Sequence, residues 1–179
     1  SIQVHPDDAY AKAHENGSLG KTECWFILDC KENATLVVGH NAKTKEELEQ
    51  MIHEGRWKEF IREIPIKPGD FIQIDPGTVH AIKGGTLLLE TQQSSDITYR
   101  VYDYDRLSNG KPRQLHIVQS IDVITVPAKS ADNSVVHIEK KDDAIQQLIQ
   151  CPYYTVYRID VEHRVETWQD KPFALMSVV

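Results

Sequence analysis

The chain has 179 residues, of which 40% are hydrophobic and 26% are charged, and its formal net charge is -7. This balance is typical of a soluble globular protein with one domain, or with one domain and part of another. The acidic charge without a basic block argues against a nucleic-acid or membrane-surface partner, and no apolar run is long enough to cross a bilayer.

The chain begins at Ser1 without a visible signal peptide, and we expect it to be a segment of a longer protein. Its three cysteines are Cys24, Cys30 and Cys151. Their odd number and the lack of a Cys-x-x-Cys pair argue against a disulfide scaffold or a thiolate zinc site. We therefore expect free thiols and a reducing, cytoplasmic location. A catalytic cysteine is a weaker alternative, because no base can be placed beside any of them.

The first 40 residues predict three short strands. Residues 2–5 form a short apolar run that ends at Pro6. Residues 7–20 are polar and predict a loop with one turn of helix. The runs 22–30 and 34–40 are rich in aromatic and β-branched residues, which predicts two strands joined as a hairpin.

A helical insertion is predicted over about 44–63. Thr44 can cap a helix, and Glu47 three residues later can complete a capping box. Apolar residues at helical spacing follow in two groups, separated by Gly55: Leu48, Met51 and Ile52, then Trp57, Phe60 and Ile61. Pro65 ends the second helix.

The rest of the chain predicts mainly strands. Strand-like runs lie at 71–75, 86–93, 97–105, 134–139, 153–162, 165–169 and 173–179, and residues 119–126 predict a helix followed by a strand. Such a pattern indicates an all-β jelly-roll barrel with one helical insertion. We divide the chain into a domain at 1–128, a linker at 129–134 and a partial second β domain at 135–179.

Gln3 and His5 raise the first question of chemistry. Alternate residues of a strand share a face, so both side chains point away from the face of Val4. If Val4 lies in the core, they face solvent; if the strand lines a barrel, they face its interior. A histidine inside a small barrel needs a partner, either a hydrogen-bonding group or a metal ion.

Two later residues favour the metal. Glu23 begins one predicted strand, and His80 follows the turn in "DPGTVHA". With Gln3 and His5 they make a nitrogen and oxygen ligand set that leaves positions open, as catalytic metal sites do. Such a centre attracts sugar oxygens and phosphates and stabilises a developing oxyanion.

Four strings of the sequence, in order, resemble a known family. The strings "QVHPDD", "GKTECWF", "PGDFIQIDPGTVHAI" and "LLLETQQSSDITYRVYDYDR" look like type I mannose-6-phosphate isomerase in its short bacterial form. The similarity runs from Ile2 to about Val126 and is weaker beyond. Relatives carry further segments before the first string and after residue 179, so the resemblance also implies a fragment.

The resemblance implies a cupin barrel, followed by the start of a second cupin-like domain. It implies one zinc ion held by Gln3, His5, Glu23 and His80. The family interconverts mannose 6-phosphate and fructose 6-phosphate through a cis-enediol. Active-site roles carry over to Lys21, Glu90 and Arg100, each within a matching string.

The chemistry of proton transfer agrees with these roles. Moving a proton between adjacent carbons needs a base and a group that holds the enediolate. Burial beside the "TLLL" run would raise the pKa of Glu90 towards that of a useful base, so we rank it first, ahead of a zinc-bound water or His5. Arg100 suits the enediolate or the phosphate, and Lys21 lies two residues before Glu23. The alternative is a structural ion pair of Arg100 with Glu90 and a solvated Lys21.

Other readings stay open at this point. The cupin pattern Pro-x-Gly-x-x-His is altered in "DPGTVH", where the proline stands one position later. A sugar-phosphate binding module, an Fe(II) cupin enzyme and a structural β domain are alternatives, although Gln3 as a fourth ligand disfavours iron. Asp103, Asp105 and Arg106 predict a structural network, and Asp7 and Asp8 predict loop-capping acids. The sequence leaves the oligomeric state undetermined.

Overall fold

The computed structural model describes residues 1–131, 134–168 and 170–179. Its helices are α1 (Asp8–His14), α2 (Lys45–His53), α3 (Trp57–Phe60) and α4 (Ile117–Val123). Its strands are β1 (Ile2–Val4), β2 (Glu23–Cys30), β3 (Thr35–His40), β4 (Ile61–Pro65), β5 (Asp70–Ile74), β6 (His80–Ala81), β7 (Thr86–Gln92), β8 (Tyr99–Tyr102), β9 (Leu107–Ser108), β10 (Lys111–Pro112), β11 (Val135–His137), β12 (Ala144–Gln150) and β13 (Thr155–Asp160).

Two sheets form the body of the molecule. The first has the strand order β4-β3-β6-β1-β8, and the second has the order β11-β5-β2-β7. Neighbouring strands in both are antiparallel. Most neighbours are not consecutive in the chain, so the chain crosses repeatedly from one sheet to the other, as in a jelly roll.

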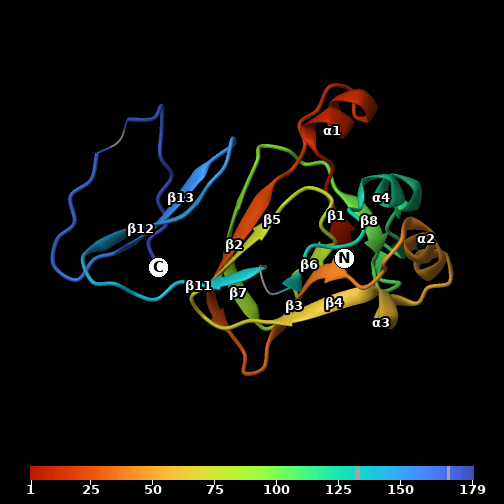
Figure 1. Ribbon diagram of the computed structural model, residues 1–179, viewed down its shortest axis with the longest axis horizontal. Helices are drawn as coiled ribbons and strands as arrows, with labels where there is room; N and C mark the ends of the chain where they lie inside the picture. Colours follow the sequence, from red (N-terminus) through yellow and green to blue (C-terminus); the bar gives the residue numbers. More distant parts are fainter. Residues whose placement is uncertain (132–133, 169) are drawn as a thin grey trace.

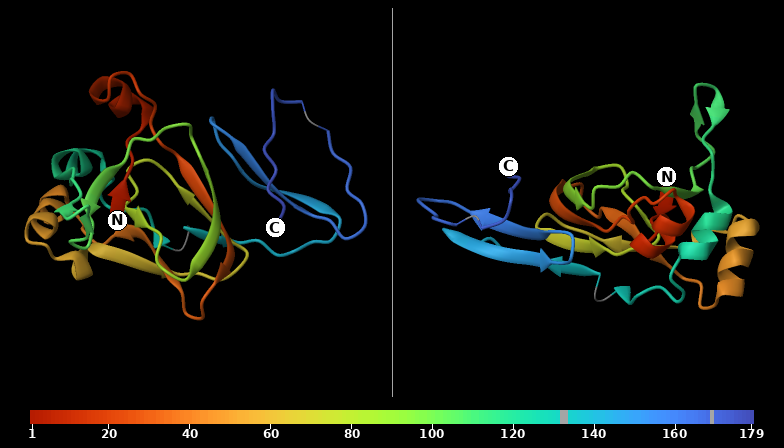
Figure 2. Two further views of the ribbon diagram at one scale, coloured as in Figure 1. Left: turned by 180° about the vertical axis from the view of Figure 1, so that it is seen from behind. Right: turned by 90° about the horizontal axis from the view of Figure 1, so that it is seen from above.

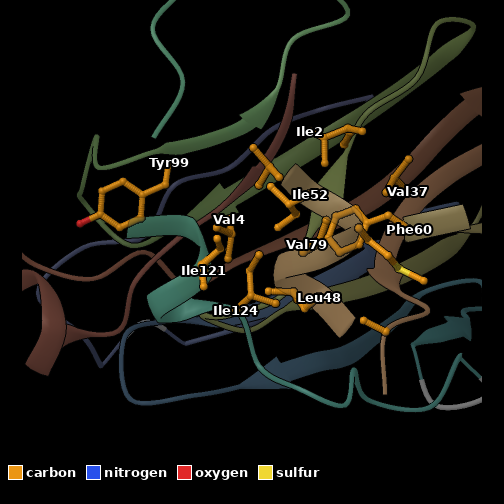
Figure 3. Close-up of a cluster of buried hydrophobic side chains, with 14 residues drawn as sticks. Ile2, Val4, Val37, Leu48, Ile52, Phe60, Val79, Tyr99, Ile121 and Ile124 are labelled. Carbon is orange, nitrogen blue, oxygen red and sulfur yellow. The ribbon is translucent and has the colours of Figure 1, made fainter. Parts of the chain in front are cut away.

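Helices cover the outer face of the first sheet, where α2, α3 and α4 gather at one end of the molecule (Figure 1). Ile2 and Val4 of β1 and Val37 of β3 are fully buried against this helical layer, with Leu48 and Phe60 from the insertion (Figure 3). The helical spacing of the insertion therefore places its apolar stripe on the sheet. This layer gives β1 an apolar face on the side away from the second sheet.

A second apolar cluster lies between the two sheets. It contains Trp25, Ile27, Leu36, Val38, Ile64, Ile66, Ile72 and Ile74. Trp25 and Ile27 alternate along β2 with residues of the other face, and Ile72 and Ile74 do the same along β5. Their alternation with period two is what a strand facing another sheet requires.

The predicted hairpin of residues 22–30 and 34–40 is wrong, although both strands are present. β2 pairs with β5 and β7, whereas β3 pairs with β4 and β6, so the two strands lie in different sheets. Long-range pairing places β2 between two later strands, and the short turn at Asn33 crosses from one sheet to the other.

The helical predictions are largely confirmed, with corrected ends. Thr44 caps α2 by accepting a hydrogen bond from the Glu47 backbone N–H at 3.2 Å. The second helix stops at Phe60, because residues 61–65 pair with β3 as strand β4. α1 spans seven residues, about two turns rather than one. Residues 119–126 begin inside α4, and residues 124–126, where a strand was expected after the helix, belong to none.

The C-terminal part forms a separate hairpin of β12 and β13 (Figure 2). β11, which we expected to begin the second domain, instead pairs with β5 at the edge of the second sheet. The runs 165–169 and 173–179 were predicted as strands, and their described residues carry none. Residues 132, 133 and 169 lie outside the described residues, and the division at 129–134 stays a prediction. No helix in the described ranges is both long and apolar enough to span a membrane.

Candidate metal centre

Gln3 and His5 point into the space between the two sheets. Ile2 and Val4 are fully buried on the helical side, so the residues that alternate with them face the second sheet. Gln3 pairs across β1 with His80 on one side and with Arg100 on the other. Directly opposite residues of antiparallel strands share a face, so these three side chains form one row.

Glu23, at the start of β2, meets this row from the opposite sheet. Its Oε2 lies 3.3 Å from His5 Nε2, and its Oε1 lies 3.3 Å from His80 Nε2. His5, Glu23 and His80 are each at most 1% exposed. Ligand atoms from these three residues lie within 4.8 Å of one another, and the cluster could hold a metal ion.

Backbone carbonyls fix the orientation of both imidazole rings. His5 Nδ1 donates to the carbonyl of Ile97 at 2.9 Å, and His80 Nδ1 donates to the carbonyl of Thr78 at 2.8 Å. The proton of each neutral ring therefore resides on Nδ1, and Nε2 turns its lone pair towards Glu23. This is the outer-shell arrangement usual for metal-binding histidines.

The cluster leaves buried polar atoms without hydrogen bonds. His5 Nε2 and both carboxylate oxygens of Glu23 have no hydrogen-bond partner among the described residues. Buried polar groups are rarely left unpaired without a functional reason. The separations of 3.3 Å match the spacing of about 3.3 Å between ligands in a tetrahedral site with metal–ligand distances of about 2.0 Å. The donor set fits a divalent metal.

Gln3 lies beside this cluster as its fourth member. Its amide Nε2 lies 3.3 Å from His80 Nε2. A half-turn of the amide would direct Oε1, the atom that can ligate a metal, to the same place. Gln3 is half-buried, in contrast to its three neighbours.

The charges of the cluster match metal binding. Burial alone would raise the pKa of Glu23, but the nearby His5, His80 and Lys21 outweigh it and lower the pKa to about 2. Burial lowers the pKa of His80 to about 4, against the opposing effect of Glu23. At neutral pH the centre thus presents a carboxylate and a neutral His80, the forms that ligate.

The structure places Lys21 and Arg100 around the cluster. Lys21 is buried, and its Nζ lies 3.4 Å from Glu23 Oε2. Arg100 shares the row of Gln3, and its Nε is buried without a hydrogen-bond partner in the described part of the chain. Both cations therefore face the space beside the metal cluster.

Glu90 lies on the same inner face, two residue pairs along the β2–β7 ladder from Glu23. It is opposite Trp25 in the β2–β7 pairing, and its Oε2 accepts a hydrogen bond from Trp25 Nε1 at 3.2 Å. Desolvation by its surroundings and then the negative charge of Glu23 raise its pKa, although the side chain stays accessible to solvent. The pKa of Glu90 is raised, which is the direction expected from the sequence.

Trp25 is a residue of the site that sequence reasoning placed only in the core. It is 1% exposed, its ring edge meets His80 at a centroid distance of 5.6 Å, and its N–H binds Glu90. The signal was available, because Trp25 stands two residues after Glu23 and so shares its face in a strand.

Other predicted residues lie outside the centre. Asp103 accepts hydrogen bonds from Arg106 and Arg113, whose guanidinium groups hold its pKa well below the usual range. This agrees with the expected structural network. The three cysteines are free thiols, and burial raises the pKa of Cys24 to about 11, which argues against a nucleophile there.

Two facing sheets with a histidine- and carboxylate-lined space between them define a cupin-type fold with a candidate metal site. The whole chain is 51% identical to a mannose-6-phosphate isomerase of Bacillus subtilis and 48% identical to one of Streptococcus mutans, of which it covers 57% and 56%. No family model matches the chain. It is homologous over its full length to mannose-6-phosphate isomerases, as its sequence motifs predicted, and spans little more than half of their length.

Solved structures of mannose-6-phosphate isomerases have a fold similar to that of this chain. The mannose 6-phosphate isomerase from Bacillus subtilis is similar at a TM-score of 0.79 and 48% identity, over 90% of this chain and 52% of that one. A phosphomannose isomerase variant from Salmonella typhimurium is similar at a TM-score of 0.62 and 14% identity, over 79% of this chain and 54% of that one. The cupin fold expected from the sequence is confirmed.

Proposed function

We propose that this chain carries the metal centre and reacting groups of a mannose-6-phosphate isomerase, which interconverts mannose 6-phosphate and fructose 6-phosphate through a cis-enediol. One observation carries the proposal: His5, Glu23 and His80 bring their ligand atoms together beside Lys21, in a chain 51% identical to such an isomerase. The sugar phosphate is the expected small-molecule partner.

The residues divide into metal ligands and reacting groups. Gln3, His5, Glu23 and His80 would hold zinc, since two imidazoles with amide and carboxylate oxygens suit that ion. When bound, zinc supplies positive charge that stabilises a developing oxyanion. A single anionic ligand, Glu23, would leave the centre with a net positive charge.

Glu90 is the proposed base. Its raised pKa makes the carboxylate a stronger proton acceptor, and the Trp25 N–H holds one oxygen in place. The carboxylate takes the proton from C2 of mannose 6-phosphate and returns it to C1, while the proton of the C2 hydroxyl passes to the C1 oxygen, which yields fructose 6-phosphate. Because one group serves both carbons, its access to solvent determines how much of the proton exchanges with water.

Lys21 and Arg100 hold the negative charges of the substrate. The Lys21 ammonium lies within reach of a hydroxyl at the metal cluster, because its Nζ is 3.4 Å from Glu23 Oε2. The Arg100 guanidinium has an unpaired buried Nε and can bind the enediolate or the phosphate through parallel hydrogen bonds.

The test is the rate of conversion of mannose 6-phosphate, measured with and without a chelator. We expect the chelator to abolish the rate and His80→Ala to lower it by more than about 100-fold together with the bound zinc. His53→Ala, a change at an exposed histidine in the last turn of α2, should leave both unchanged. A rate that survives both chelator and His80→Ala contradicts the proposal. Binding of mannose 6-phosphate without turnover would favour the sugar-phosphate binding module.

A further inference from the structure

The segment that carries Lys21 is held outside the regular sheet. β2 begins only at Glu23, so residues 20–22 lie between α1 and the strand. Yet Lys21 is buried and its ammonium reaches Glu23. Something other than the strand ladder must hold this segment in place.

Asp8, the first residue of α1, holds the beginning of the segment. Its Oδ1 accepts a hydrogen bond from the backbone N–H of Gly20 at 2.8 Å and another from Gln93 Nε2 at 2.7 Å. Its Oδ2 accepts one from the Tyr153 hydroxyl at 2.8 Å. The hydrogen bonds from Gln93 and Tyr153 lower the pKa of Asp8, so the carboxylate is charged at neutral pH.

Gln93, which follows β7 and is 6% exposed, holds the end of the segment. Its Oε1 accepts from the Thr22 N–H at 3.2 Å, and its own backbone N–H donates to the Thr22 carbonyl at 2.8 Å. Between the two side chains, the Lys21 N–H donates to the carbonyl of Pro6 at 3.0 Å. All three backbone N–H groups of residues 20–22 are thus paired.

Gly20 allows the backbone of residues 20–22 to pack closely against the backbone of Asp7 and Asp8. A Cβ at this position would lie 2.4 Å from the Asp7 carbonyl carbon and 2.5 Å from the Asp8 nitrogen. Both are backbone atoms, so the contact cannot be relieved by a side-chain rotation. The segment therefore packs directly on the turn that follows His5.

We propose that Asp8 and Gln93 are positioning residues for Lys21, and that together they hold its ammonium against the metal cluster. The proposal rests on the proposed function, in which Lys21 contacts the substrate. The two side chains contact the backbone on both sides of Lys21 and each other, and so act through Lys21 rather than on the sugar. Asp8 thus binds the loop, as expected of a loop-capping acid, whereas Asp7 caps helix α1 through the Tyr10 N–H at 2.8 Å.

The experiment compares Asp8→Ala, Asp8→Asn and Gln93→Ala with Asp7→Ala as the matched control. Hydrogen exchange of the amides of residues 20–22 is measured on zinc-loaded protein, with acetylation of Lys21 followed relative to the exposed Lys45 by mass spectrometry. We expect Asp8→Ala and Gln93→Ala to increase the rates of amide exchange and of Lys21 acetylation by at least about 10-fold. In each variant a backbone N–H, that of Gly20 or that of Thr22, loses its acceptor. Asp8→Asn keeps an Oδ1 acceptor and should restore slow exchange.

Kinetics supply the second measurement. A misplaced ammonium should lower kcat by about 10-fold or more with a smaller change in KM, since small displacements of reacting groups lower rates strongly. Asp7→Ala should lower the melting temperature through the lost cap without this kcat effect. Equal behaviour of Asp8→Ala and Asp7→Ala in exchange and kcat overturns the proposal. If the unsubstituted protein does not isomerise, the proposed function fails, while exchange and acetylation still decide whether Asp8 and Gln93 hold Lys21.

Discussion

Glu23 and His80 couple the stability of the metal-free protein to pH. The buried His80 has a pKa of about 4 against an ordinary 6.5, so the unfolded chain binds its proton first. The free energy of unfolding should therefore fall as the pH drops from about 6.5 towards 4, by at most about 1.4 kcal/mol per pH unit. Glu23, with a pKa of about 2 against 4.5, adds a further loss below pH 4.5.

Urea unfolding of chelated protein at pH 7, 5.5 and 4.5 measures this dependence. His80→Gln removes the titrating ring and keeps a side chain that can hydrogen-bond the Thr78 carbonyl, so its stability should change less between pH 7 and 4.5. An equal decline in both proteins would contradict the assignment to His80.

At the scale of residues, much of the centre could be predicted from the sequence. The strings around His5, Glu23 and His80 pointed to the three residues that converge, and alternation placed Gln3 with His5. The direction in which His5 faces could not be predicted. The sequence allowed either Val4 or His5 to be buried, as if only one face of β1 were covered. The helical layer buries Val4 while the opposite sheet buries His5.

At the scale of elements, the turn between β5 and β6 connects both histidines. Gly77 has a φ of 81°, its N–H donates to the His5 carbonyl at 2.9 Å, and a Cβ there would lie 2.8 Å from the Val123 carbonyl oxygen. Gly77→Ala should lower stability by about 1–3 kcal/mol and weaken zinc binding, because it displaces the backbone of His5 and the turn before His80.

Gly84→Ala is the matched control for this turn. Gly84 has no positive φ, and no described heavy atom lies within 4 Å of its added Cβ. Thermal unfolding and zinc titration of both variants check the prediction, and a Gly77→Ala protein that binds zinc as tightly as Gly84→Ala contradicts it.

Elements with strong local signals were easier to predict than their partners. The Thr44 cap and the apolar spacing identified α2, because both act within a few residues. The hairpin of β2 and β3 failed because strand pairing depends on distant contacts: β2 takes β5 and β7 as neighbours. Propensity identifies a strand but carries no information on which strand lies beside it.

At the scale of the whole molecule, the C-terminal part is the least determined by sequence pattern. Strand-like runs at 165–169 and 173–179 predicted strands, yet strands form only when an edge or a face is available for pairing. Their described residues instead remain outside the sheets. Strand β11 (Val135–His137), in contrast, pairs with the edge of β5 and so belongs to the second sheet.

Exposed apolar side chains in the C-terminal part predict self-association. Those more than 70% exposed are Trp168, Phe173, Leu175, Met176, Val178 and Val179. Large apolar residues gathered in one segment mark an interaction surface or an aggregation liability. The net charge of -7 opposes association, and salt screens that repulsion, so the apparent mass should rise with protein concentration and with salt.

Sedimentation equilibrium at low and high salt measures this association. The double substitution Phe173→Ser with Leu175→Ser should weaken it by at least about 10-fold, since burying either side chain contributes about 1.5–3 kcal/mol. Val118→Ser, at a 71% exposed position of α4, removes apolar surface elsewhere and should change little. If both proteins associate equally, or if the unsubstituted protein stays monomeric at high salt, the C-terminal segment does not drive assembly.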